Sequence, residues 1–326
     1  MSKKIKKFDK TFDNIFTLNN IFDAWRNFKK GKSNKKDILI FEQNAFSKIY
    51  KLYEEIINNK YIHDKYESFI VYDPKKRQIH KATVKDRIIH QLIYDKLYSY
   101  FSKFFILDSY SSQVGKGTHS ALKRYKRFYF KCSKNNTKTA YVLQCDIKKC
   151  FASIDQNILI SILKDYIKCS KFMNILKIII KSRPCGIPLG NLTSQLFINI
   201  YMHEFDKYVK FVLKEKYYIR YADDFIIMNC NKKHLLNIIQ DISYFLKNRL
   251  NLDLHPNKIS IKTSSSGVDF LGWINFSDHM VLRVKTKKRV LKKITDKNMT
   301  SYMGLLQQGN SKNLQKTIFS LLKEQK

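Results

Sequence analysis

Two adjacent carboxylates stand at the centre of the short stretch Tyr221-Ala222-Asp223-Asp224. Burying an isolated carboxylate among apolar side chains is strongly unfavourable, and a divalent cation offsets that cost. Mg²⁺ is typically bound by one or two carboxylates together with substrate phosphates, so the pair predicts phosphoryl-transfer chemistry. The alternative is a solvent-facing Asp-Asp turn in an ordinary hairpin, and for a bare Asp-Asp pair that alternative is the better interpretation.

The sequence on both sides of the pair favours the chemical interpretation. Residues 217–221 and 225–228 are rich in aromatic and β-branched side chains, which predicts two short strands with the acidic pair at or beside their turn. Asp146 ends the apolar stretch 140–147, a position typical of either a metal ligand or a helix cap. Asp155 precedes a helical pattern directly, so we assign it a capping role.

The chain is strongly basic along its whole length. It has 326 residues, with 62 Lys and Arg against 27 Asp and Glu, giving a formal net charge of +35. Such a charge predicts a polyanionic partner, with nucleic acid the first candidate and an anionic membrane surface the second. No apolar stretch approaches the about 18 residues of a membrane-spanning helix, so no membrane partner is expected. An AT-biased genome is a third explanation for part of the lysine excess.

Composition also limits the fold and the location. The length allows two domains or one large domain with appendages, and 44% hydrophobic residues allow a substantial core. The six cysteines show no C-x-x-C and no zinc-site spacing, so reduced thiols are expected. The N-terminus is basic but lacks the apolar segment of a secretory signal, so a cytoplasmic location is expected.

Further elements are expected to position the carboxylates and their substrate. Residues 69–80 predict a hairpin whose basic tip carries Lys75, Lys76 and Arg77, either a solvated turn or a clamp on a triphosphate. Residues 186–195 predict a tight glycine loop that leads into a helix from about 196, which suits close approach of a phosphate or of backbone. Helices are expected over residues 1–65, 83–106, 120–131, 156–168, 232–250 and from 285 to the end.

In this order the pieces resemble a reverse transcriptase over roughly residues 75–275. Asp146 with Phe151 resembles the first catalytic palm motif, and Tyr-Ala-Asp-Asp resembles the second. Lys258 stands where the family has its next palm lysine. The remaining blocks are Phe270-Leu271-Gly272-Trp273, which resembles the primer grip, and Arg77-x-Ile, Asp86-Arg87 and residues 110–119, which resemble the bacterial and group II intron branch. Blocks in the family's order are far more specific than any one of them.

The resemblance implies an α+β, right-hand polymerase fold with an antiparallel palm sheet. It implies an N-terminal helical region over 1–68, interleaved fingers and palm over 69–275, and a small helical thumb over 276–326. The implied activity is RNA-directed DNA polymerisation from a DNA or RNA primer. Two Mg²⁺ or Mn²⁺ ions would be held by Asp146, Asp223 and Asp224.

The resemblance also implies a nucleotide site. Phe151 would lie under the sugar and exclude a 2′-hydroxyl, the alternative being core packing. Arg77 stands in the matching motif position for a triphosphate contact, and Lys258 would neutralise the leaving pyrophosphate or remain a solvated lysine. The full implied set is Lys75, Arg77, Phe151, Leu189, Gly190, Gln195 and Lys258.

The glycine loop carries the subfamily signal. Most bacterial and retroviral members have Pro-Gln-Gly and then Ser-Pro, whereas this chain has Pro188-Leu189-Gly190-Asn191 and then Ser194-Gln195. The loop resembles reverse transcriptases of diversity-generating retroelements, which copy a template RNA with errors mainly at adenines and work with a small basic, pentameric accessory variability protein. Ala222 departs from that subfamily, where Met is more frequent.

Two other functions remain as alternatives. One is an antiphage-defence reverse transcriptase. The other belongs to a different class, a catalytically idle RNA-binding scaffold, and the intact acidic triad argues against it.

Overall fold

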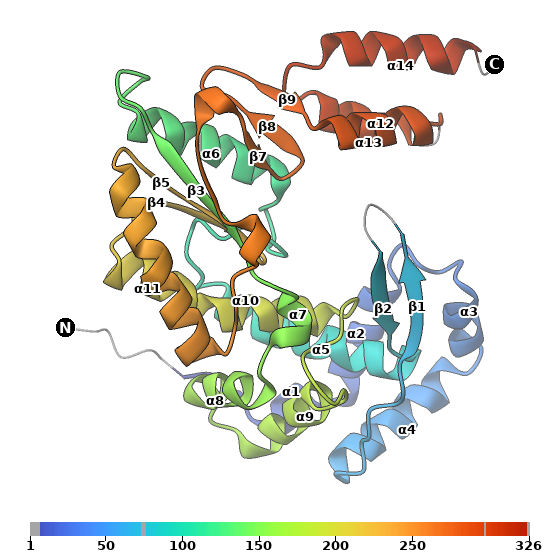
Figure 1. Cartoon of the computed structure of the whole chain (residues 1–326). Helices are drawn as coiled ribbons and strands as arrows, with labels where there is room; N and C mark the ends of the chain where they lie inside the picture. Colours follow the sequence, from blue (N-terminus) through green and yellow to red (C-terminus); the bar gives the residue numbers. More distant parts are fainter. Residues whose placement is uncertain (1–6, 73–75, 297, 325–326) are drawn as a thin grey trace. The chain divides into compact units, whose positions relative to one another are not determined.

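The computed structural model describes residues 7–72, 76–296 and 298–324, and Figure 1 shows their elements along the chain. The chain forms two compact units, each assembled from three separate segments. Unit 1 consists of Met1–Ile106, Ile147–Tyr208 and Tyr244–Asp253. Unit 2 consists of Leu107–Asp146, Val209–Ser243 and Leu254–Lys326.

Unit 1 is mainly helical. Its elements are α1 (Phe12–Ile15), α2 (Leu18–Lys29), α3 (Lys36–Glu42), α4 (Ala45–Ile57), the hairpin of β1 (Glu67–Val71) and β2 (Arg77–Lys81), α5 (Val84–Phe101), α7 (Cys150–Ser153), α8 (Gln156–Tyr166), α9 (Ser170–Ile180) and α10 (Leu192–Lys207). Thr17, Thr83 and Asp155 each accept a hydrogen bond from a backbone N–H in the first turn of α2, α5 and α8. The capping role predicted for Asp155 is therefore confirmed.

Helix α5 is the centre of unit 1. It packs against α2 and α10, and Ile88, Ile89, Leu92 and Ile93 along it are almost completely buried. Burial of each such side chain contributes about 1.5–3 kcal/mol, so this helix is a main source of the unit's stability. It also connects the β1–β2 hairpin, directly before it in sequence, to the helix that follows the glycine loop.

Unit 2 is built on a four-stranded antiparallel sheet in the order β4-β5-β3-β6. Its strands are β3 (Tyr141–Asp146), β4 (Tyr217–Tyr221), β5 (Asp224–Asn229) and β6 (Ser260–Thr263), and a second sheet contains β7 (Val268–Phe270), β8 (Trp273–Asn275) and β9 (Met280–Leu282). The helices of unit 2 are α6 (Thr118–Cys132), α12 (Val284–Lys293), α13 (Met299–Leu306) and α14 (Lys312–Glu324). Helix α11 (Lys232–Leu250) begins in unit 2 and ends in a segment of unit 1.

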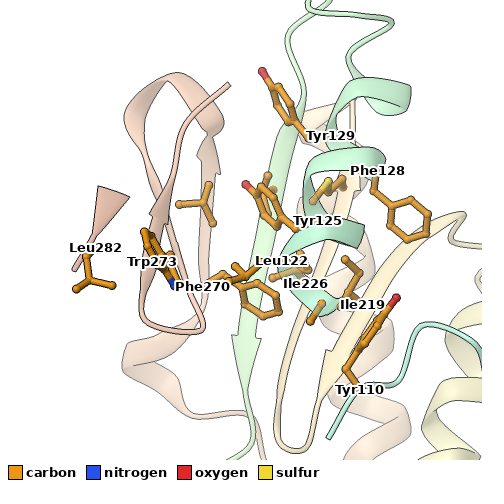
Figure 2. Close-up of a cluster of buried hydrophobic side chains, with 14 of the residues drawn as sticks. Tyr110, Leu122, Tyr125, Phe128, Tyr129, Ile219, Ile226, Phe270, Trp273 and Leu282 are labelled. Atoms are coloured by element: carbon orange, nitrogen blue, oxygen red, sulfur yellow. The ribbon is translucent and has the colours of Figure 1, made fainter. Parts of the chain in front are cut away.

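A single cluster of buried side chains joins α6 to both sheets of unit 2 (Figure 2). Ile219 and Ile226 face each other in the register of β4 and β5. Tyr125 comes from α6, and Phe270 and Trp273 come from the second sheet. Because this core includes both strands of the hairpin that carries the acidic pair, the hairpin is held on a rigid support.

Most of the predicted elements are present, but several boundaries differ. The helix predicted over 83–106 ends at Phe101, and the helical stretch predicted from 285 is divided into α12, α13 and α14. The hairpins, the strand ending at Asp146 and the N-terminal helices are confirmed. The glycine loop was expected to run to 195, but α10 already begins at Leu192. The β7–β9 sheet was not predicted beyond the apolar turn at 270–273, because its strands are only three residues long.

None of the helices in the described part of the chain is both long and apolar enough to cross a membrane. All six cysteines, which fall within the described ranges, are free thiols, as the sequence predicted.

Candidate functional site

The β4–β5 hairpin places the acidic pair at its turn. Tyr221 pairs with Asp224, so Ala222 and Asp223 form a two-residue turn and Asp224 is the first residue of β5. Ala222 has a φ of +56°, in the left-handed region, where its small side chain limits the steric cost. The turn therefore presents two consecutive carboxylates at the end of a buried hairpin.

Asp146 lies beside this turn on the neighbouring strand. It is the last residue of β3 and is directly opposite Asp224 in the antiparallel register. Residues opposite each other on neighbouring strands have Cβ atoms about 4.5–5.5 Å apart and point to the same face. The three carboxylates assigned from the sequence are thus brought together within unit 2.

Lys258 makes a direct contact with this group. It ends a short 3₁₀ helix (Pro256–Lys258) beside β6, and its Nζ lies 2.6 Å from Oδ2 of Asp146. The backbone N–H of His255, at the start of the same segment, donates to the carbonyl oxygen of Asp146 at 2.7 Å. The sequence placed Lys258 on or beside a strand, and the structure adds its carboxylate partner.

The environment of Asp224 disfavours its ionised form. Burial, with a contribution from the neighbouring charges of Asp146 and Asp223, raises the pKa of Asp224 to about 7. The amide of Gln144, 3.5 Å from Oδ1 of Asp224, and the more distant Lys258 ammonium act in the opposite direction but do not cancel the effect. A bound cation would favour the ionised form and remove this cost.

The oxygen atoms of Asp146, Asp223 and Asp224 are suitable ligands for a hard divalent cation, but in this structure the side chains are not arranged to coordinate one. In the ranges that the structure describes, no three His, Cys, Asp or Glu side chains are grouped closely enough to hold a metal ion as they stand. The ammonium of Lys258 engages an oxygen of Asp146. Carboxylate oxygens are ligands that Mg²⁺ prefers, and a cation at Asp146 would compete with Lys258 for that carboxylate.

Two residues that the sequence did not single out support this site. Arg220 is fully buried in β4, and its Nη1 donates to the carbonyl oxygen of Ala222 at 3.1 Å, which ties down the acidic turn. Gln144 on β3 donates to the carbonyl oxygen of Asp269 at 2.8 Å. The sequence signal that could have identified Arg220 is an arginine within an otherwise apolar strand, because a buried guanidinium needs hydrogen-bond acceptors nearby.

In unit 1, the glycine loop packs against the β1–β2 hairpin. The backbone N–H of His80 donates to the carbonyl oxygen of Leu189 at 3.0 Å. Gly190 has a φ of +117°, and a Cβ there would lie 2.8 Å from Cγ2 of Ile79. Only glycine allows this close approach without strain. Arg77 is the exposed first residue of β2, and Lys75 lies outside the described residues.

Phe151 is also tied to the glycine loop. It is half-buried in the short helix α7, and its carbonyl oxygen accepts a hydrogen bond of 2.8 Å from the N–H of Ile187. A Cβ on Gly186 would lie 2.6 Å from that same carbonyl oxygen, so the loop passes close to α7. Gln195, expected in the loop, is instead an exposed residue in the first turns of α10.

The apolar turn at 270–273 joins β7 to β8. Phe270 and Trp273 pair in register and are fully buried, so both belong to the core (Figure 2). Leu271 and Gly272 both have positive φ and form the half-buried two-residue tip, with Leu271 packed against the core cluster. Arg283 holds this region in place through an ion pair with Asp269 and a backbone hydrogen bond to Gly272.

Comparison with known proteins gives a match over most of the chain. The family model described as "Reverse transcriptase (RNA-dependent DNA polymerase)" matches residues 46–275. The group II intron-encoded protein LtrA of Lactococcus lactis is 25% identical over 293 residues, covering 67% of this chain and 48% of its own. The putative COX1/OXI3 intron 2 protein of Saccharomyces cerevisiae is 25% identical over 253 residues, covering 57% and 28%. The chain thus spans about half or less of the length of these relatives.

Solved telomerase structures share the fold. Apo telomerase from Candida tropicalis has a TM-score of 0.52 at 15% identity, covering 71% of this chain and 50% of that one. Telomerase from Candida albicans in complex with a fragment of telomeric RNA has a TM-score of 0.51 at 11% identity, covering 76% and 50%. The likeness shows the fold alone, and it confirms the predicted α+β right-hand polymerase.

Proposed function

This chain belongs to the reverse transcriptase (RNA-dependent DNA polymerase) family, and we propose that it extends a DNA or RNA primer on an RNA template. One observation carries the proposal: Asp146 stands opposite Asp224 on paired strands, with Asp223 in the adjoining turn. Three carboxylates at one end of a buried sheet are costly unless they serve a cation. Within the region that matches the family, they are best explained as its metal-binding residues.

In the proposed reaction Asp146, Asp223 and Asp224 hold two Mg²⁺ or Mn²⁺ ions. Such ions, when bound, stabilise the attacking and leaving oxygens of an in-line displacement at phosphorus. Lys258, which contacts Asp146 in this structure, would neutralise the leaving pyrophosphate once that carboxylate is engaged elsewhere. Arg220 would keep the acidic turn in position through its hydrogen bond to Ala222.

We propose that the residues of unit 1 that the family resemblance implies bind the nucleotide. Lys75 and Arg77 would hold the triphosphate, and Phe151 would exclude a 2′-hydroxyl. The hydrogen bond between His80 and Leu189 supports this, because it links the strand that carries Arg77 to the glycine loop. The implied set also includes Leu189, Gly190 and Gln195, and the hairpin tip at 270–273 would contact the primer strand.

Primer extension on a defined RNA template tests the proposal. Asp223→Asn removes one charge with almost no change of shape, so extension should fall by about 100-fold or more. Binding of the template–primer should stay close to that of the wild type, since the basic surface is unchanged. Extension by this variant at a near wild-type rate with Mg²⁺ would remove Asp223 from the metal site.

We further propose that the enzyme copies with errors at template adenines, as part of a diversity-generating retroelement. Leu189 supports this proposal: its backbone is fixed by His80, and its side chain has no polar atom with which to hold a nascent base pair. The Gln that most relatives carry at this position has a side chain that can hydrogen-bond the nucleotide. Without that hydrogen bond, the free-energy difference between correct and incorrect nucleotides would be smaller by about 1–3 kcal/mol. A small basic accessory protein would be the partner in template choice.

Sequencing of cDNA made from one RNA by the wild type and by Leu189→Gln tests the finer proposal. We expect frequent misincorporation opposite adenine in the wild type and about 5-fold or more reduction in the variant. Uniformly low error in the wild type would favour the defence alternative. High error that Leu189→Gln leaves unchanged would keep the function and discard this role of Leu189.

A further inference from the structure

A cavity of about 450 Å³ lies in unit 2 at the end of the β4–β5 hairpin that is remote from the acidic turn. Its wall includes Tyr217 and Met228, which pair in register at that end. With a rise of about 3.3 Å per strand residue, this pair lies ~13 Å along the hairpin from the pair formed by Tyr221 and Asp224. The cavity is therefore separate from the carboxylate site.

Four exposed lysines line this cavity: Lys131 and Lys134 from the end of α6, and Lys214 and Lys216 from the segment before β4. Among the described residues none of the four has a carboxylate partner within 4.0 Å. The acidic residue in the described lining is Glu215, which is buried and bonded to Nε2 of His234 at 2.5 Å. The ammonium groups thus surround a concave surface with little compensation.

We propose that this lysine-lined cavity binds the phosphate backbone of a nucleic-acid segment outside the catalytic site. This inference rests on the proposed function, because a polymerase that copies RNA must also hold the part of the template that is not yet paired. Converging charges in a concavity attract a polyanion more strongly than the same charges on a convex surface. Each phosphate that is neutralised also releases counterions.

The side chains present indicate how such a segment is recognised. The Lys and Arg positions that line the cavity are all lysines. Lysine contacts phosphate as a point charge, whereas arginine more often reads a planar edge in a bidentate manner. Binding here should accordingly be independent of base sequence and sensitive to salt.

A cysteine in the cavity wall provides a direct readout. Cys230 is exposed and its Sγ donates to the carbonyl oxygen of Cys132 at 3.0 Å. Cys169, partly exposed in unit 1, is the internal control. With RNA at ten times its Kd, occupancy should slow alkylation of Cys230 by N-ethylmaleimide by up to about 10-fold. Peptide mass spectrometry measures both thiols in one sample, and Cys169 should not change.

Two nucleic acids distinguish the source of the bound phosphates. One is a blunt template–primer duplex, and the other is the same duplex with a long single-stranded template extension. Protection of Cys230 by the extended form alone assigns the cavity to unpaired template, and protection by both assigns it to the duplex. No protection by either, or equal protection of Cys169, overturns the proposal.

A charge variant with a matched control completes the test. The cavity variant replaces all four lining lysines by Gln: Lys131, Lys134, Lys214 and Lys216. The control variant replaces four exposed lysines elsewhere by Gln: Lys35, Lys36, Lys51 and Lys60. The cavity variant should lose Cys230 protection and reduce the slope of log affinity against log salt by roughly 0.7 for each contact with single-stranded phosphate. Equal salt slopes in both variants would overturn the proposal. Primer extension by the wild type, measured alongside, tests the proposed polymerase activity separately.

Discussion

Asp224→Asn should stabilise the metal-free protein at the same time as it inactivates it. The ordinary pKa of an aspartate is 3.8, and burial together with Asp146 and Asp223 raises that of Asp224 to about 7. Between these two values the folded state keeps a proton that the unfolded state has lost. The free energy of unfolding therefore falls as pH rises through this window, and the loss is complete above about pH 7.

The difference of about three pKa units corresponds to at most ~4 kcal/mol, and ~1–4 kcal/mol is expected after relaxation of the site. Asparagine carries no charge at any pH, so the variant avoids this cost. In EDTA at pH 8 Asp224→Asn should be more stable than the wild type by that amount, and the difference should shrink by roughly half at pH 5.

Urea unfolding at both pH values, with and without Mg²⁺, measures the effect. Mg²⁺ at pH 8 should stabilise the wild type, since a ligand that binds the folded state raises its stability, and should affect the variant much less. Asp253→Asn is the control, because Asp253 is exposed and its change should stay within about 0.5 kcal/mol. A variant less stable than the wild type in EDTA at pH 8 would refute the assignment of Asp224 as an uncompensated carboxylate.

Two other substitutions test neighbouring parts of the proposed nucleotide site. Phe151→Ala should lower the ratio of dNTP to rNTP incorporation efficiency by about 10-fold or more, and an unchanged ratio would assign Phe151 to core packing. Gly190→Ala should cost about 1–3 kcal/mol and raise the KM for dNTP, because its φ is positive and a Cβ would meet Ile79. Gly115→Ala is its control, with a positive φ but nothing within 4 Å, and KM should not change there.

Local sequence signals were sufficient for most elements of the fold. The hairpin at 217–229 is predictable because apolar strands flank a turn, and α8 because Asp155 provides a cap before a helical pattern. The start of α10 was misplaced although Asn191, a residue type typical of N-caps, directly precedes it; in the structure its side chain makes no capping hydrogen bond. The β7–β9 sheet depends on tertiary packing around Trp273, which no three-residue pattern encodes.

The sequence predicted which carboxylates belong together, because it placed each at a strand end and the family's block order supplied their neighbours. It could not predict which other side chains contact the carboxylates and their turn. The contact of Lys258 with Asp146 depends on β6 pairing with β3, a pairing between segments more than a hundred residues apart. The hydrogen bond from Arg220 to Ala222 likewise depends on how the turn folds back.

At the acidic turn, the burial that stabilises the hairpin opposes the ionisation of its carboxylates. Tyr218, Ile219, Phe225 and Ile226 are fully buried, as a stable hairpin requires, yet the second strand begins with Asp224, a carboxylate whose pKa burial raises to about 7. A cost retained at one point of an otherwise consistent sheet indicates function, because it would be removed easily by Asn or Ser. Arg220, buried two residues before the turn, stabilises the arrangement by donating a hydrogen bond to the carbonyl oxygen of Ala222. A cation bound beside Asp224 would favour its ionised form and remove the cost that burial imposes on it.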